Sequence, residues 1–201
     1  IKAVMCEFAE KGNMIYHGHA GQELLRGISH VLKVLLVTPL EYRIRLVCER
    51  TGVSAEEAAK QIAKMDEDRI KRIRYFFDKD FRNPSLYDLV VNVETMSFES
   101  AADVICHTVQ LKDFQPTEVS MRSLHNMSLA SRVRAALVVS PGTSHVAINV
   151  TANDGVVTLS GSISSTSTEK EILQVVKGVE GVEKVENSLI VNPGYQSFPW
   201  S

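Results

Sequence analysis

The chain has 201 residues, of which 44% are hydrophobic and 23% charged, a composition typical of a globular protein that can bury a core. The formal net charge is −2; residues 1–112 are neutral overall and residues 113–201 are acidic, so neither half has the basic surface that binds nucleic acid. No apolar run reaches the ~20 residues that cross a bilayer. Three widely spaced cysteines without a CxxC pair favour a reducing compartment, so we expect a cytoplasmic protein.

The first half of the chain alternates between helix and strand patterns. The runs HVLKVLLV and LYDLVVNV indicate strands buried on both faces, and Ser54 with Glu57 forms a capping box. The expected elements are a helix at 2–11, a strand at 13–17, a short helix at 20–26, a strand at 30–37, helices at 40–51 and 55–77, a strand at 86–93 and a helix at 98–110. A break near residues 66–68 is left open in the helix at 55–77. This alternation predicts an α/β domain with a parallel sheet over residues 1–110. Because the chain starts inside a helical pattern, we expect a further N-terminal portion to precede Ile1.

The second half has a different pattern. Residues 111–126 show no clear period and are expected to be a linker. A helix at 127–138, strands in HVAINV and GVVTLSG, a helix at 165–178 and a strand at 182–191 follow. The dipeptide Asp154-Gly155 between the first two strands is a strong hairpin signal. Residues 127–193 therefore predict a small α+β domain in the order α-β-β-α-β, followed by a tail at 194–201.

A glycine turn, Gly18-His19-Ala20-Gly21, joins the expected strand at 13–17 to the short helix. A Walker phosphate loop requires a Gly-Lys pair followed by Ser or Thr. No Gly-Lys dipeptide occurs in this sequence, so we assign no catalytic residue. No Cys, Asp or Glu lies at ligand spacing from His17 and His19, so no metal site is expected.

A charged stretch, KMDEDRIKRIRYFF, covers residues 64–77. On a helix, Arg69 and Arg72 share a face that is not the apolar one, and arginine grips phosphate oxygens through its planar fork. The spacing alone favours a solvated face that is balanced by the acidic residues 66–68. An anion site is the alternative.

Three segments together resemble the later two-thirds of the cytidylate kinase-like family over residues 3–108: NMIYHGHAGQELLRG, the stretch from VLKVLLVTPLEYRIRLVCERTG to KRIRYFF, and NPSLYDLVVNVETMSFESAADVI. Members of that family are similar to P-loop nucleoside monophosphate kinases, which move the ATP γ-phosphoryl group to CMP or a related nucleotide. The resemblance implies that Asp66, Arg69 and Arg72 lie in the lid over the phosphates, with Arg43 and Arg45 on the helix that leads to it. It also implies ATP and Mg²⁺ as cofactors of a full-length enzyme; no cofactor is expected in this chain.

Two departures from the family pattern matter. The Walker loop should lie upstream of Ile1, outside this chain. Family members also usually have an arginine in the glycine turn, where it meets the acceptor nucleotide. Here Gly18, His19 and Gly21, with Arg43, would form that acceptor-nucleotide edge, and a histidine that is mostly neutral at pH 7 replaces the cation.

The second half resembles a BON domain over residues 128–191, through the pattern VVTLSG, a helix, and GVEKVENSLIV. Gly155, Gly161 and Gly181 fall at the turns that this fold needs. BON domains are thought to bind phospholipid or other ligands, or to mediate association. Since this half is acidic, we favour an interaction or ligand-sensing module over a site for anionic lipid.

These observations lead to one hypothesis and two alternatives. The chain is a degenerate or truncated nucleoside monophosphate kinase-like domain joined to a regulatory BON domain in a bacterial cytoplasm, and by itself it is expected to be inactive. Alternatively, the full-length protein is an active cytidylate-type kinase whose Walker loop lies upstream. In the second alternative, the protein is not an enzyme. The BON domain then binds a phospholipid or a protein partner, and the kinase remnant is a dimerisation scaffold. The expected partners are thus a nucleotide, a ligand of the BON domain and a second copy of the chain.

Overall fold

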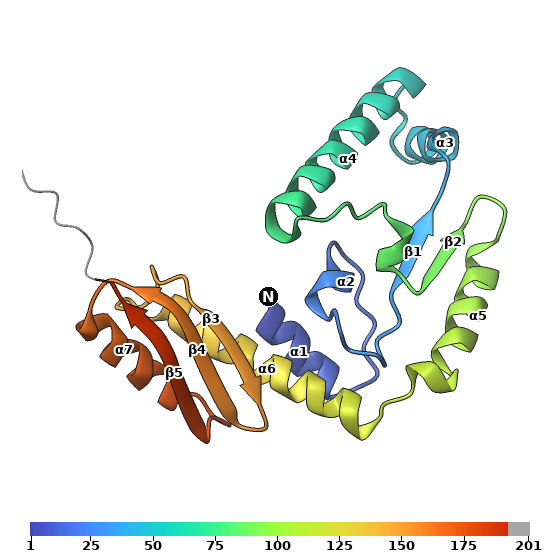
Figure 1. The fold of residues 1–201 in the computed structure, drawn as a ribbon. Helices are drawn as coiled ribbons and strands as arrows, with labels where there is room; N and C mark the ends of the chain where they lie inside the picture. Colours follow the sequence, from blue (N-terminus) through green and yellow to red (C-terminus); the bar gives the residue numbers. More distant parts are fainter. Residues whose placement is uncertain (193–201) are drawn as a thin grey trace, which may run out of the picture. The chain divides into compact units, whose positions relative to one another are not determined.

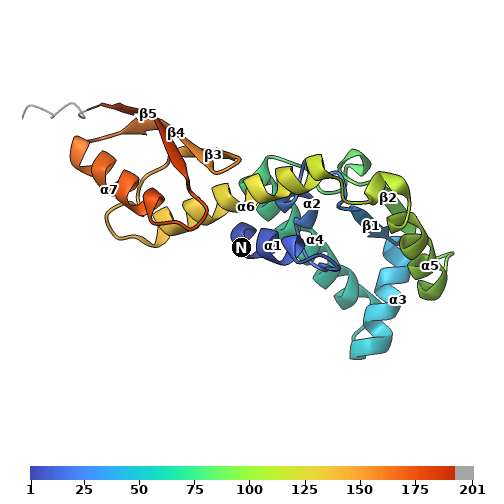
Figure 2. The ribbon, with the colours of Figure 1, turned by 90° about the horizontal axis from the view of Figure 1, so that it is seen from below.

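The computed structural model describes residues 1–192, so the tail expected at 194–201 lies outside the described residues. The chain divides into two compact units, and Figures 1 and 2 show their elements. The central unit comprises Ile15–Thr117. The composite unit comprises Ile1–Met14 together with the chain from Glu118 onward. Within residues 1–192, no helix combines the length and the apolar character needed to span a membrane.

The central unit is built around a two-stranded parallel sheet, as the sequence predicted for an α/β domain. Strand β1 (Val34–Val37) pairs with β2 (Leu89–Asn92). A small core of Val91, Val93 and Ala101 packs around this pair. The other elements of the unit are α2 (Gly21–Leu24), α3 (Leu40–Thr51), α4 (Ala55–Phe77), η1 (Pro84–Leu86), α5 (Phe98–Val109) and η2 (Lys112–Phe114).

The ends of α3 and α4 follow from local chemistry. Helix α3 ends at Gly52, whose φ of 74° is the left-handed conformation that glycine adopts readily. Helix α4 begins where the Ser54 hydroxyl accepts a hydrogen bond from the Glu57 amide at 3.2 Å. It ends at Asp78, which is also left-handed. Both helices have the bounds that the sequence predicted, and α4 continues through residues 66–68 without the break that the sequence left open.

The strand expected at 13–17 is wrong. Asn13 has a φ of 52°, and none of these residues belongs to a strand. A strand forms only where a neighbouring strand supplies hydrogen-bond partners, and in the described part of the central unit the sheet consists of β1 and β2. The same limit shortens the strands expected at 30–37 and 86–93 to the four residues that pair in each.

The composite unit contains a three-stranded sheet in the order β3-β4-β5. Strand β4 pairs antiparallel with β3 and parallel with β5, and the turn at Asp154-Gly155 has positive φ at both residues, as a tight hairpin requires. The core of the composite unit includes Val133, Leu159 and Ile172, which are all fully buried. The elements are α1 (Lys2–Glu10), α6 (Glu118–Val139), β3 (Asn149–Asn153), β4 (Val156–Ile163), α7 (Thr166–Lys177) and β5 (Lys184–Val191).

The linker expected at 111–126 is instead partly helical, because η2 lies within it and α6 begins at Glu118. Helix α1 packs along the first half of α6 in both views (Figures 1 and 2), burying Met5 and Cys6 on α1 and Leu124 and Ser128 on α6. The second half of α6 packs against the sheet. A helix covered on different sides along its length lacks a single apolar stripe, which is why its first turns resembled a linker. The compact units therefore divide the chain differently from the expected domains at 1–110 and 127–193.

Candidate functional site

An ion pair joins α3 to α4 in the central unit. The Arg43 guanidinium donates two hydrogen bonds to the Asp66 carboxylate, at 2.6 and 2.8 Å, which is the bidentate geometry of a strong charge-assisted pair. The two side chains are 34% and 32% exposed. The hydrogen bond from Arg43 is the main reason why the pKa of Asp66 lies below its ordinary value, with Arg69 and Arg82 adding to the effect.

Arg69 lies beside this pair, with one donor unused. Its guanidinium carbon is 5.3 Å from the centre of the Phe81 ring, a cation–π distance. Its Nε is buried and has no hydrogen-bond partner among the described residues. A buried donor left unpaired costs free energy, so this atom is one that a bound acceptor would satisfy.

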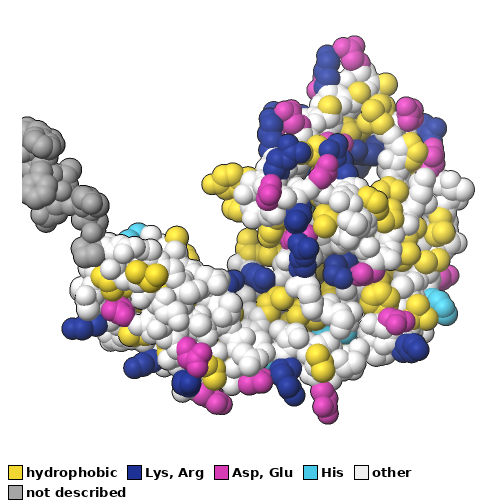
Figure 3. Space-filling view, in the orientation of Figure 1, with side chains coloured by type: hydrophobic (Ala, Val, Ile, Leu, Met, Phe, Trp, Pro, Cys, Tyr) yellow, Lys and Arg dark blue, Asp and Glu magenta, His cyan; other side chains and the backbone are white. Residues whose placement is uncertain are grey.

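The charges of this region are unequal. Arg43, Arg69 and Arg82 all act on Asp66, and Arg82 also holds Asp80 through hydrogen bonds of 2.6 to 3.2 Å that lower the pKa of Asp80 to about 2. Arg72 acts on His19 together with Arg69, and we group it with these residues. We define these six residues as the arginine cluster: Arg43, Asp66, Arg69, Arg72, Asp80 and Arg82. Figure 3 shows Lys and Arg side chains over α4 with Asp and Glu among them. An excess of positive charge favours an anion.

The glycine turn lies next to this cluster. The charges of Arg69 and Arg72 on α4 act on His19 in this turn. Burial is the largest cause that lowers the pKa of His19, and the two arginines and His17 lower it further. These effects favour the neutral form of His19.

The two glycines of the turn make room for Tyr16. A Cβ on Gly18 would lie 2.6 Å from the Tyr16 hydroxyl, and one on Gly21 would lie 2.7 Å from the ring, so a larger residue at either position requires the ring to move. Residues 1–192 contain no group of three or more His, Cys, Asp or Glu side chains that could hold a metal ion.

Of the residues that the sequence singled out, Arg43 and Asp66 are hydrogen-bonded, the charge of Arg69 acts on Asp66, and the charges of Arg69 and Arg72 act on His19. Sequence reasoning missed Asp80, Phe81 and Arg82, which complete the surroundings of Arg69. The spacing of Asp80 and Arg82 was a usable signal, since a short Asp-x-Arg segment can close an ion pair within a turn.

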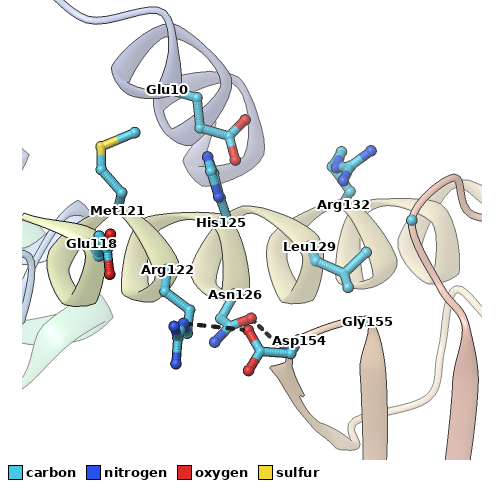
Figure 4. A pocket seen from close by; sticks show the side chains of 11 residues that line it. Glu10, Glu118, Met121, Arg122, His125, Asn126, Leu129, Arg132, Asp154 and Gly155 are labelled. Carbon is cyan, nitrogen blue, oxygen red and sulfur yellow. Dashed lines mark hydrogen bonds and ion pairs between the residues drawn. The ribbon is translucent and has the colours of Figure 1, made fainter.

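A second candidate is an open groove of about 650 Å³ in the composite unit (Figure 4). The hairpin turn forms one side of it, where the Asn126 side chain accepts a hydrogen bond from the Asp154 amide at 2.8 Å and Arg122 lies 3.8 Å from the Asp154 carboxylate. Charged side chains of both signs line the groove: Glu10, Glu118, Arg122, Arg132 and Asp154. Three acids against two arginines do not select an anion.

Comparison with known proteins assigns both parts of the chain. Residues 2–95 match the cytidylate kinase-like family. Residues 127–193 match the BON domain. Both resemblances expected from the sequence are confirmed.

Curated relatives of the kinase-like part are named cytidylate kinase. One from Ignicoccus hospitalis is 31% identical over 105 residues, which are 52% of this chain and 60% of the relative. One from Methanopyrus kandleri is 31% identical over 49% of this chain and 55% of the relative, and one from Sulfolobus acidocaldarius is 30% identical over 50% and 55%. The chain thus spans between half and two-thirds of the length of these relatives. Helix α1 belongs to the kinase-like match by sequence and to the composite unit by packing.

Proposed function

We propose that the arginine cluster of the central unit binds the phosphate groups of a nucleotide. The observation that carries this proposal is Arg69, whose buried Nε has no partner among the described residues although Arg43 and Arg82 already hold the neighbouring carboxylates. Arginine clusters bind phosphate oxygens through paired N–H donors. The relatives named cytidylate kinase support a nucleotide as the source of the phosphate.

We expect this chain to bind a nucleotide without transferring a phosphoryl group. Phosphoryl transfer needs cationic groups, a Walker lysine and Mg²⁺, that neutralise the charge developing on the transferred group, and the 201 residues contain no Gly-Lys motif. We therefore describe the kinase-like part as a degenerate or truncated nucleoside monophosphate kinase. The alternative is an active cytidylate-type kinase in a longer protein, where ATP and Mg²⁺ bind residues outside this sequence and the cluster acts as the lid.

For the BON domain, we propose the role of an interaction or ligand-sensing module. The groove of the composite unit, which residues of this domain such as Arg132 and Asp154 line in part, has nearly balanced charges, and this half of the chain is acidic. Neither property favours an anionic membrane surface. A protein or small polar ligand fits these charges better than a phospholipid headgroup.

Calorimetry with CMP and with inorganic pyrophosphate at low salt tests the phosphate site. We expect weak binding that weakens further as salt rises, because exposed charges are screened within about 8–10 Å. The double variant Arg69→Gln/Arg72→Gln should lose it. Arg72→Gln alone is the safer variant for folding, since Arg72 is exposed.

Arg50→Gln is the matched control, because Arg50 is an exposed arginine near the end of α3 that lies outside the cluster. It removes the same charge and should leave binding nearly unchanged. Equal binding by the double variant and the parent would refute the site, as would no binding of either probe at low salt.

A further inference from the structure

Tyr87 is connected to Arg69 through Phe81, in the segment between α4 and β2. The Tyr87 hydroxyl donates a hydrogen bond of 2.8 Å to the Phe81 carbonyl oxygen, and the centre of the Phe81 ring lies 5.3 Å from the guanidinium carbon of Arg69. Burial is the largest cause that raises the pKa of Tyr87. The hydroxyl therefore keeps its proton at neutral pH and stays a hydrogen-bond donor.

Tyr87 is itself fixed next to the parallel sheet. Its amide donates to the Pro84 carbonyl oxygen at 3.1 Å. The following residue, Asp88, accepts hydrogen bonds of 2.8 Å from both the amide and the side-chain ammonium of Lys33, and its own amide donates to the Lys33 carbonyl oxygen at 2.8 Å. Because Lys33 and Asp88 directly precede the paired strands β1 and β2, the place of Tyr87 is set by the sheet.

The turn that contains Phe81 is shaped by short-range hydrogen bonds. The Arg82 amide donates to the Asp80 carboxylate at 3.0 Å, and the Asn83 amide donates to the Asp80 carbonyl oxygen at 3.0 Å. These bonds set the form of the turn from within. The bond from Tyr87 joins this turn to the start of β2, so it determines where the Phe81 ring lies relative to the sheet.

The ring contact prepares Arg69 for an anion. An arginine side chain has several rotatable bonds, and a ligand that binds it must stop their rotation. A cation–π contact restricts the guanidinium before any ligand arrives. Nε of Arg69 is also buried without a hydrogen-bond partner in the described part of the chain, so this donor has already lost its water. An anion therefore binds Arg69 with a smaller loss of side-chain entropy and of hydration.

We propose that Tyr87 is a positioning residue of the phosphate site: through the Phe81 carbonyl it holds the Phe81 ring at Arg69, which keeps the guanidinium ordered for the anion. The inference rests on the proposed phosphate site and deepens it. Tyr87 acts through Phe81 and makes no contact with the ligand. The loss of its hydroxyl should therefore weaken anion binding although no charge is removed.

Pyrophosphate calorimetry at low salt tests this with Tyr87→Phe, which keeps the ring and loses the hydroxyl. We expect affinity to fall by about two- to tenfold, the effect of one side chain that must be ordered on binding. Tyr75→Phe is the matched control, because it removes the same group from a tyrosine of α4 that is 83% exposed, and it should leave the affinity unchanged. Phe81→Leu should weaken binding by a similar factor, whereas Phe81→Tyr keeps the ring and should bind like the parent.

A double-mutant cycle separates positioning from a general loss of stability. Because Tyr87 acts through the Phe81 ring, Tyr87→Phe should cause no further loss of affinity in the Phe81→Leu background. NMR of the arginine Nε–H groups, with the Arg69 signal assigned by Arg69→Gln, should show a less ordered Arg69 side chain in unliganded Tyr87→Phe than in the parent.

The outcomes that overturn the inference differ from those that overturn the phosphate site. If a folded Tyr87→Phe protein binds pyrophosphate like the parent, if its Arg69 signal is unchanged, or if the two losses add in the double variant, Tyr87 does not position Arg69 and the phosphate site still stands. Phe81→Tyr that binds as weakly as Phe81→Leu also overturns the inference. If the parent binds neither pyrophosphate nor CMP, the proposed function fails and the inference fails with it.

Discussion

Removing the Asp66 carboxylate should have opposite effects on stability and on anion binding. In Asp66→Asn, the bidentate pair at 2.6 and 2.8 Å is lost and Arg43 keeps its charge beside the other arginines. A hydrogen bond to a charged group contributes about 1.5–3 kcal/mol. Because both side chains are about one-third exposed, solvent screening reduces this, and we expect a loss of about 1–2 kcal/mol.

Thermal unfolding measures the loss. For a unit of this size, about 1–2 kcal/mol lowers the midpoint by about 5–10 °C. The control is Asp68→Asn, the same change two residues along α4 at an exposed position, which should change the midpoint little. Equal midpoints for Asp66→Asn and the parent at pH 7 would show that the pair does not stabilise the unit.

The pH dependence has a definite sign. The pKa of Asp66 is lower in the folded protein than in the unfolded chain, so its contribution is fully present above the unfolded value of about 3.9. It is lost as the pH falls through the folded pKa. The difference in stability between the parent and Asp66→Asn should therefore be constant from pH 7 to about 5 and shrink below pH 4. A difference that persists unchanged under acid would contradict this origin.

The same substitution should strengthen phosphate binding, because the Asp66 carboxylate lies within Coulombic reach of Arg69 and competes with an anion for it. A gain of about 1 kcal/mol corresponds to roughly fivefold in affinity. Pyrophosphate calorimetry at low salt measures it. Weaker binding by a folded Asp66→Asn protein would refute the idea that this carboxylate competes with the ligand.

Three further predictions concern activity and folding. The 201-residue chain should show no ATP-to-CMP phosphoryl transfer in a coupled assay, and turnover above background that Arg69→Ala abolishes would contradict this. Ser54→Ala should destabilise the central unit by about 1 kcal/mol in denaturant titration, because the cap of α4 is lost; an unchanged midpoint would show that the cap is dispensable. Ile172→Val should lower the free energy of unfolding by about 0.5–1.5 kcal/mol, because Ile172 is fully buried. The control Ile190→Val, at a 62% exposed position, should lower it much less. Equal losses in the two variants would argue against this core.

Local sequence determined the helices of the central unit. The Ser54 cap, the glycine after Thr51 and the apolar periodicity act within a few residues, so the ends of α3 and α4 could be read directly. The order of elements in the BON domain was predictable for the same reason, since the Asp154-Gly155 turn fixes the hairpin register. At positions 66, 69 and 72 the spacing alone favoured a solvated face, and the expectation of a phosphate-binding lid came from the family resemblance.

Tertiary structure decided what depends on distant partners. Residues 13–17 have the apolar character of a strand but no neighbour to pair with in the described chain, and the first turns of α6 are helical because α1 covers them. Arg43 and Asp66 are 23 residues apart, and Arg69 on α4 acts electrostatically on His19 in the glycine turn. Charge and hydrogen bonding act through space at a few ångströms, so a sequence can supply the right side chains while the fold alone determines which of them meet.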